Sequence, residues 1–158
     1  MDIRSGKPYP ACALSNFAPH EFFIDGVRCA SAEGFLQSLK FKGVDMQEHI
    51  CSLVGRAAKA AGKDKNWKTT QTLYWRGVEI KRDSDEYQKL LDRAYAALAQ
   101  NEGFVNALLA THDANITHSI GKSKINDTVL TEREFCSRLL RLRKELQSSD
   151  DLKRNGLE

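Results

Sequence analysis

The sequence predicts an α+β fold, namely a mainly helical single domain with a small β-sheet or hairpin. Three observations support this prediction. Asp25-Gly26 separates two β-prone runs within FFIDGVRC. Several segments begin with a helix-capping residue that precedes apolar residues at helical spacing. Finally, Thr131 and Glu134 match the S/T-x-x-E capping box.

Length and composition favour one domain without a membrane segment. The chain has 158 residues, of which 41% are hydrophobic and 28% charged, and such a chain buries a core without a metal or disulfide. We assign residues 1–147 to the domain and residues 148–158 to a polar C-terminal tail that frays. No run approaches membrane-spanning length, and the N-terminus lacks the apolar region of a signal peptide.

Charge and cysteine spacing exclude several classes of protein. The net charge of +3 is low for a dedicated duplex-DNA binder but is compatible with a phosphate-bearing ligand. No cysteine pair has C-x-x-C spacing, so neither a metal site nor a cofactor is expected. Cys51 and Cys136 fall within apolar helical patterns and are expected to be buried free thiols, which suit a cytoplasmic location.

The first half of the chain is expected to contain an arm, a hairpin and two helices. Residues 1–10 form an irregular arm, and residues 22–29 form the hairpin, because Asp-Gly tolerates the positive φ angles of a type I′ turn. A helix capped by its first serine follows over residues 31–43. A second helix covers residues 45–62, where Asp and Glu at the start resemble a capping box and a glycine ends the helix.

The second half begins with a basic loop at residues 63–68. Residues 72–80 are β-rich and form either a strand or a short irregular connection. Residues 115–120 are a short β candidate, and residues 121–127 are a polar turn. Three capping residues mark further helix starts: Ser84, Asn101 and Thr131.

Glu33 is the leading catalytic candidate. It lies in the first turn of the helix over residues 31–43, where the helix dipole favours a carboxylate and lowers its pKa. Gln37 and Lys40 follow at i+4 and i+7 and share its helix face, which either is solvated or lines a pocket. The alternative is an ordinary helix-start charge. The polar and aromatic candidates for substrate binding around it are Asn16, Phe17, Gln37 and Lys40.

His118 and the Gly121-Lys122 turn are the second candidate group. The turn offers backbone N–H groups and positive charge to a phosphate, although its spacing is not that of a P-loop. The alternatives are a hydrogen-bonded structural histidine and a solvated basic turn.

Trp75 and Arg82 combine an aromatic ring with a cation. Such a pair suits stacking on a base and pairing with a phosphate, while burial of Trp75 in the core is equally compatible with the pattern. The basic run of the last helix, Arg138, Arg141, Arg143 and Lys144, is interpreted as a solvated face. No Ser-His-Asp order or dinucleotide fingerprint is present.

Several stretches, taken as an ordered set over residues 14–146, resemble the NADAR superfamily of YbiA-like N-glycosidases. Leu14-Ser15-Asn16-Phe17, Asp25-Gly26, Ser31-Ala32-Glu33 and the segment from Gln37 to Lys40-Phe41 resemble its S-N-F, D-G, S-x-E-h and Q-x-x-K-F motifs. Later segments resemble its remaining motifs: Ala57 to Gly62, Gln100-Asn101, Leu108-Leu109, Thr111-His112-Asp113, and Leu139 to Leu146 with Arg143. The segments EGFLQSLKF and THSIGK resemble those of a phage-encoded branch of the superfamily.

The resemblance implies hydrolysis of an N-glycosidic bond between a base and a phosphorylated ribose. Substrates of the superfamily include ribosylaminopyrimidine phosphates and ADP-ribose attached to guanine, so the expected partner is such a small molecule or an ADP-ribosylated nucleic acid. It also implies that Glu33 is the catalytic carboxylate. A phage-encoded protein would act in the bacterial cytosol or the infected host cytoplasm.

Two family motifs are replaced in this sequence. Ile116-Thr117-His118 stands where the family has a second acid in L-x-E, and residues 122–128 lack the D-x-x-W-G motif. Either His118, Lys122 or Asp127 has taken over, or the domain only binds its ligand. An oxocarbenium-like state is stabilised by a nearby carboxylate, which suits Glu33, and a histidine, which titrates near neutrality, suits protonation of the departing base.

A non-catalytic binder of ADP-ribose or nucleotides, or a phage accessory protein acting on a host partner, is the alternative to an enzyme. A single-stranded nucleic-acid module is a third possibility, which the scattered basic residues disfavour. The sequence does not indicate an oligomeric state.

Overall fold

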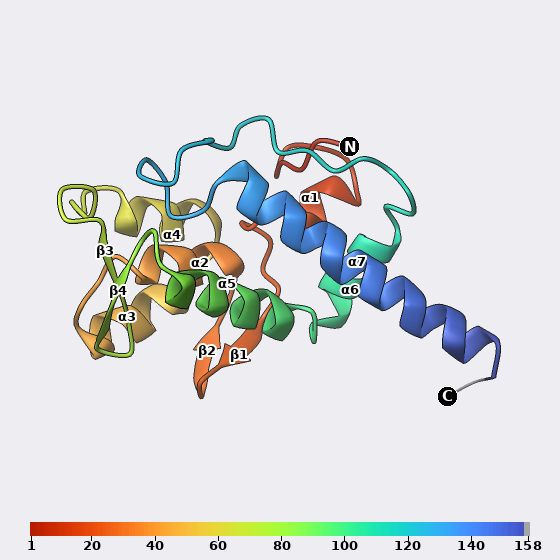
Figure 1. Ribbon diagram of the computed structural model, residues 1–158, viewed down its shortest axis with the longest axis horizontal. Helices are drawn as coiled ribbons and strands as arrows, with labels where there is room; N and C mark the ends of the chain where they lie inside the picture. Colours follow the sequence, from red (N-terminus) through yellow and green to blue (C-terminus); the bar gives the residue numbers. More distant parts are fainter. Residues whose placement is uncertain (157–158) are drawn as a thin grey trace.

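Short helices and two β-hairpins precede one long C-terminal helix (Figure 1). This computed structural model describes residues 1–156. The elements in chain order are α1 (Ala11–Leu14), β1 (Phe22–Ile24), β2 (Val27–Cys29), α2 (Ala32–Ser38), α3 (Val44–Cys51), α4 (Gly55–Gly62), β3 (Thr72–Trp75), β4 (Val78–Lys81), α5 (Asp85–Leu98), α6 (Glu102–Leu109) and α7 (Glu132–Arg154). The predicted α+β class is confirmed.

The core forms where α2, α5 and α7 bury their apolar faces. Helix α2 packs against α3, α4 and β2, and α5 packs against α7 and both hairpins. Phe35 of α2 is 1% exposed, and its ring meets Trp75 edge-on at 5.1 Å between centroids. Tyr87 and Phe135 bring α5 and α7 into the same core. Within the described residues, no helix is both long and apolar enough to cross a membrane.

Both hairpins close with two-residue turns at positive φ. Asp25 and Gly26 have φ of 50° and 78°, so the predicted hairpin is confirmed, with Ile24 paired to Val27. The β-rich segment at residues 72–80, which the sequence left open, is a second hairpin. Arg76 and Gly77 form its turn with φ of 54° and 84°. The two sheets are two-stranded and antiparallel.

The predicted caps are present at four helices. The side chains of Ser31, Ser84, Asn101 and Thr131 accept hydrogen bonds from the backbone N–H groups three residues further on. Glu134 also accepts from the N–H of Thr131 at 2.8 Å, which completes the capping box. These bonds satisfy donors that a helix start leaves free, so helix positions follow directly from these residues.

The prediction of one helix over residues 45–62 is wrong, because the chain breaks into α3 and α4. The carbonyl of Cys51 accepts the N–H of Ala30, and that of Leu53 accepts the hydroxyl of Ser31. These bonds divert the last carbonyls of α3 to the start of α2, and Gly55 at φ 54° redirects the chain. Helix α3 has no side-chain cap, so the expected capping box at its start is not formed.

The ends of the chain also differ from expectation. Helix α7 continues to Arg154, so residues 148–154 are helical rather than frayed; residues 157–158 of the predicted tail lie outside the described residues. The β candidate at residues 115–120 is a single bridge, in which Thr117 pairs with Asp2 of the N-terminal arm. The short helix α1 was not predicted.

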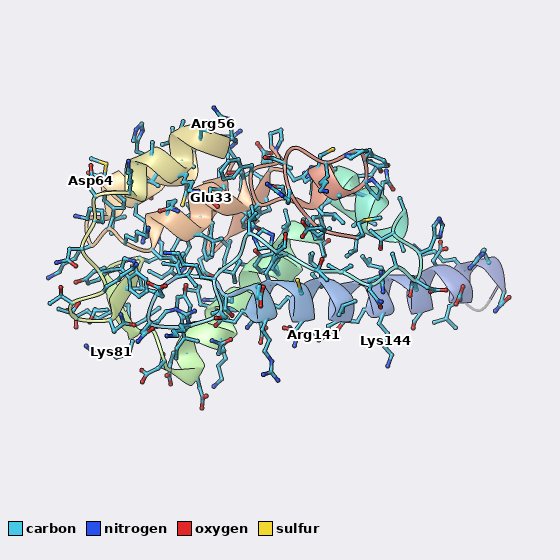
Figure 2. The ribbon with its side chains drawn as sticks, turned by 90° about the horizontal axis from the view of Figure 1, so that it is seen from above. Glu33, Arg56, Asp64, Lys81, Arg141 and Lys144 are labelled. Carbon is cyan, nitrogen blue, oxygen red and sulfur yellow. The ribbon has the colours of Figure 1, made fainter. Side chains whose placement is uncertain are left out.

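The basic residues of α7 do not form one solvated face. Arg141 and Lys144 project outward from the helix (Figure 2). Arg138 is 6% exposed and pairs with Asp92 of α5, and Arg143 donates to Thr111. Cys51 is buried as predicted whereas Cys136 is half-buried, and both thiols are free.

A buried ion pair joins α7 to the second hairpin. Arg82 is 1% exposed and donates to both carboxylate oxygens of Glu134, at 3.1 and 2.6 Å. Its Nε donates to the carbonyl of Thr128 at 2.8 Å. Gln88 of α5 donates to Glu134 at 2.6 Å. Burial acts to raise the pKa of Glu134, but the bonds from Arg82, the Thr131 N–H and Gln88 hold it below its ordinary value.

We expect Glu134→Ala to lower the free energy of unfolding by about 3–5 kcal/mol, because it leaves the Arg82 guanidinium buried and unpaired. Glu48→Ala, which removes an exposed partner of Arg76, should cost less than about 1 kcal/mol. Urea denaturation measures both. Equal losses would contradict the structural role of the buried pair.

The same carboxylate should make stability fall in acid. Because the pKa of folded Glu134 is depressed, its contribution is present above its unfolded pKa, about 4.3, and is lost as pH falls through the folded pKa. Urea midpoints between about pH 5 and 3 should therefore drop more steeply in the wild type than in Glu134→Gln. Parallel curves would contradict this assignment.

Candidate active site

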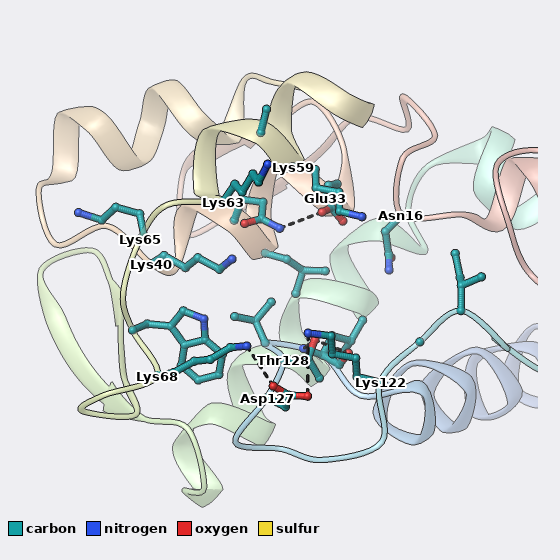
Figure 3. Close-up of a pocket in the computed structure, with 18 of the residues that line it drawn as sticks. Asn16, Glu33, Lys40, Lys59, Lys63, Lys65, Lys68, Lys122, Asp127 and Thr128 are labelled. Carbon is teal, nitrogen blue, oxygen red and sulfur yellow. Dashed lines mark hydrogen bonds and ion pairs between the residues drawn. The ribbon is translucent and has the colours of Figure 1, made fainter.

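A cavity of about 640 Å³ lies between helices α2 and α4 on one side and the loop at residues 118–130 on the other (Figure 3). Its lining combines the half-buried carboxylate of Glu33 with one imidazole and many cations. The residues that line it are Asn16, Glu33, Leu36, Gln37, Lys40, Arg56, Lys59, Ala60, Lys63, Lys65, Trp67, Lys68, His118, Ile120, Gly121, Lys122, Asp127, Thr128, Val129 and Leu130.

Glu33 lies in the inner wall of this cavity, in the first turn of α2. The Ser31 cap starts the helix, and the Glu33 N–H donates to the carbonyl of Asn16 at 2.9 Å, which fixes the backbone here. Figure 2 places Glu33 toward the middle of the molecule. Gln37 Nε2 donates to Glu33 Oε1 at 2.9 Å, so the predicted shared helix face is confirmed as a direct contact.

The predicted direction of the Glu33 pKa is wrong. Burial raises the pKa of this carboxyl, and the hydrogen bond from Gln37 and the charges of Lys59, Lys40 and His118 only partly oppose that effect. Helix α2 has only seven residues, so its dipole is a weak source of stabilisation compared with the loss of hydration. Glu33 is therefore a better proton acceptor than a solvent-exposed glutamate.

Cations surround the carboxylate on three sides. Helix α4 presents Arg56 and Lys59, its C-cap residue is Lys63, and the loop after it presents Lys65 and Lys68. Lys40 extends from α2 and donates to the carbonyl of Gly62 at 3.3 Å. Burial lowers the pKa of Lys40, with Glu33 opposing this and Lys68 and Lys122 adding to it.

The outer wall is the loop at residues 118–130. Asp127 accepts from Lys68 at 3.0 Å and lies 3.9 Å from Lys122, so it connects the cations of both walls (Figure 3). The hydrogen bond from Lys68 and the charge of Lys122 lower the Asp127 pKa. The N–H of Glu132 donates to the carbonyl of Lys122, and Arg82 and Tyr87 hold the carbonyls of Thr128 and Val129.

His118 lines the same cavity as Glu33, and two contacts fix its ring. Its Nδ1 lies 2.8 Å from the carbonyl of Ile3, and its ring packs edge-on against Phe135 at 5.0 Å between centroids. Since a carbonyl only accepts, Nδ1 carries a hydrogen and Nε2 is the nitrogen left for a ligand.

The structure brings together seven of the ten predicted site residues: Asn16, Glu33, Gln37, Lys40, His118, Gly121 and Lys122. The other three, Phe17, Trp75 and Arg82, are not among the described residues that line the cavity. Trp75 is 5% exposed in the core and donates to Asp25 at 2.7 Å. Arg82 is neutralised by Glu134, so it anchors the outer wall instead of meeting a ligand.

Sequence reasoning missed the contribution of α4 as a wall. The residues Arg56, Lys59 and Lys63 recur at i, i+3 and i+7, a spacing that indicates one helix face. The alanines between them predicted only the opposite, apolar face of the helix. The sequence predicted a basic loop around Trp67 but no functional role for it. Among the described residues, no cluster of three His, Cys, Asp or Glu side chains could hold a metal ion.

Comparisons with known proteins identify the family and the fold. Residues 8–144 match a family described as bacteriophage protein GP30.3. A 17.1 kDa protein from the Gp30–rIII intergenic region of enterobacteria phage T4 is 43% identical over 150 residues, which cover 92% of this chain and 98% of the relative. The solution structure of Escherichia coli YbiA superposes with a TM-score of 0.60 at 20% identity, covering 95% of this chain and 86% of that chain. These findings confirm the predicted YbiA-like fold and the predicted phage-encoded branch.

The cationic walls should bind a diphosphate. We expect Lys59→Gln and Lys122→Gln each to weaken binding of ADP-ribose by about 3- to 10-fold, because each removes one charge-assisted contact at a partly solvated site. Isothermal titration calorimetry measures the change. Lys144→Gln, an exposed lysine of α7 away from the cavity, is the control and should leave affinity unchanged. Equal weakening by all three would mean that only net charge matters.

Proposed function

The chain belongs to the bacteriophage protein GP30.3 family, and from this premise we propose that it is an N-glycosidase, which hydrolyses the bond between a base and a phosphorylated ribose or ADP-ribose. The observation that carries the proposal is the position of Glu33, a half-buried carboxylate inside a cavity whose other charges are mainly cationic. The shared fold with YbiA is consistent with it.

The cationic walls suit the phosphates of such a substrate. Lysines from α4, from the segment after α2 and from the two loops converge on the cavity, whereas among residues 1–156 only Glu33 and Asp127 carry negative charge in its lining. An anionic ligand would therefore be held with its phosphates toward these walls and its sugar toward Glu33. Leu36, Trp67 and Val129 supply an apolar surface for the base.

Glu33 would act on the sugar carbon. As the N-glycosidic bond breaks, positive charge develops at the anomeric carbon, and an ionised carboxylate stabilises it. Water then adds to that carbon, and Glu33 takes the proton that the water loses. The raised pKa of Glu33 favours this second role, because a more basic carboxylate accepts a proton more readily.

His118 would protonate the departing base. With Nδ1–H bound to the carbonyl of Ile3, a protonated ring presents Nε2–H to the ligand. The base leaves with that proton, so one water is consumed and one N–H bond is formed for each bond cleaved. His118 thus takes the role that the second family acid has in the resembled sequences.

The matched glutamate variants test the carboxylate. Glu33→Gln should reduce turnover of ADP-ribosylated guanosine to background while leaving the fold intact, because the amide neither stabilises positive charge nor accepts the proton. Glu102→Gln alters an exposed glutamate in the first turn of α6, also after a cap, and should retain wild-type activity. Normal turnover by Glu33→Gln would refute the proposal.

The histidine variants test the acid. His118→Ala should lower kcat by about 10²–10⁴-fold, whereas His49→Ala, on the exposed face of α3, should not. The release of free guanine and ADP-ribose, measured by liquid chromatography, gives the rates. Ribosylaminopyrimidine phosphate should be assayed in parallel to identify the preferred base.

A non-catalytic binder is the second candidate. It is favoured by the lack of a second glutamate or aspartate beside the inner wall, since Asp127 is engaged by Lys68. Calorimetry with ADP-ribose separates the two. Binding without any product from either substrate would assign the chain to this class.

A further inference from the structure

Only one of the two polar atoms of the Gln37 carboxamide forms a hydrogen bond within residues 1–156. Its Nε2 donates to Glu33 at 2.9 Å. Its Oε1 is fully buried and has no hydrogen-bond partner among residues 1–156. A buried acceptor without a donor is energetically unfavourable, so this arrangement calls for a physical reason.

The carboxamide is held tightly where it lies. Gln37 is 7% exposed, and Gly62 of α4 packs directly against it. A Cβ atom placed on Gly62 would lie 1.9 Å from Gln37 Oε1. Glycine at this position therefore leaves room for the carboxamide, and no ligand in the cavity can reach the buried oxygen.

An ionised Glu33 allows only one orientation of the Gln37 carboxamide, whereas a protonated Glu33 also allows the opposite one. An ionised carboxylate only accepts, so it requires the Gln37 NH2 group, as observed. A protonated carboxyl can donate, and a half-turn of the carboxamide about its last side-chain bond would present Oε1 to that proton. The acceptor that now has no partner would then have one.

We infer that Gln37 is a positioning residue whose carboxamide makes a half-turn when Glu33 gains a proton, so that Glu33 is hydrogen-bonded in both of its states. This inference rests on the proposed function, in which Glu33 takes a proton from water. After hydrolysis, Glu33 is protonated and His118 is neutral. Transfer of the Glu33 proton to solvent, and of a solvent proton to His118, returns both groups and Gln37 to their starting states.

Other charged groups around the pair act on it without replacing it. Lys40 of α2, Lys59 of α4 and His118 of the outer loop favour the ionised form of Glu33. Tyr95 of α5 stays neutral, because burial raises its pKa, and its hydroxyl donates to Asn16 at 2.7 Å. Among these neighbours, Gln37 is the one that contacts Glu33 directly and can either donate or accept.

Nuclear magnetic resonance tests the half-turn of the Gln37 carboxamide in the absence of substrate. In the wild type, the Gln37 side-chain NH2 protons should show a cross-peak to the Gly62 Hα protons only at pH values below the Glu33 titration midpoint, followed by the Glu33 carboxyl ¹³C shift. In Glu33→Gln the cross-peak should not depend on pH. In His118→Ala the transition should remain and follow Glu33. A wild-type cross-peak that is the same on both sides of the midpoint would overturn the inference.

Turnover kinetics provide a second test. A fixed donor would favour only ionised Glu33, so Gln37→Met would move the acidic limb of the kcat/KM–pH profile upward by more than about 1 pH unit. If the carboxamide serves both states of Glu33, Gln37→Met should move this limb by less than about 0.5 pH unit. The same substitution should lower kcat about 10-fold, because the carboxylate is no longer oriented. A shift above 1 unit would overturn the inference.

Gly62→Ala should reproduce the kinetic effect of Gln37→Met, because the new methyl group takes the space of Oε1. Gly43→Ala is the matched control, since a Cβ there meets nothing within 4 Å. Wild-type kcat in Gly62→Ala would overturn the inference. If the resonance transition is present but the wild type has no activity, the proposed function fails while the coupling of Gln37 to Glu33 stands.

Discussion

The buried ion pair between Arg82 and Glu134 is the constraint on which the cavity depends. Glu134 belongs to the capping box that starts α7, so the position of the long helix and the position of this charge are set together. Arg82, at the end of the second hairpin, reaches past the carboxylate to the carbonyl of Thr128. One guanidinium thus joins a helix start, a hairpin and the outer wall of the cavity, and a loop with few apolar residues of its own becomes ordered.

The cavity uses this scaffold to hold a carboxylate in one wall and an imidazole in the other. The inner wall carries a carboxylate that burial makes more basic, and the outer wall carries an imidazole whose Nδ1 is already engaged. Lysines around them supply a field that attracts anions and also limits how far the carboxylate pKa rises. In the proposed function, the same charges would serve both the binding of an anionic ligand and the adjustment of the Glu33 proton affinity.

Local signals in the sequence were sufficient for most elements and for several of the residues that line the cavity. Caps and the Asp-Gly turn act within three or four residues, so Ser31, Asn101 and Thr131 could be recognised without a structure. The break before α4 could not, because it depends on bonds from Ala30 and Ser31 to carbonyls more than 20 residues away. Trp75 and Arg82 show the same limit. An aromatic residue beside a cation looks alike in a binding site and in a core, and only the distant partners Asp25 and Glu134 distinguish the two.

The contact between His118 and the carbonyl of Ile3 links residues 115 positions apart in the chain. Closing so long a loop is entropically costly and tends to come late in folding. During synthesis, the segment that orients this imidazole leaves the ribosome well before the imidazole does and must wait for the intervening residues before it finds its partner. Competence for proton transfer would then arise only after His118 has emerged, so shorter nascent fragments would carry the carboxylate wall but lack the imidazole.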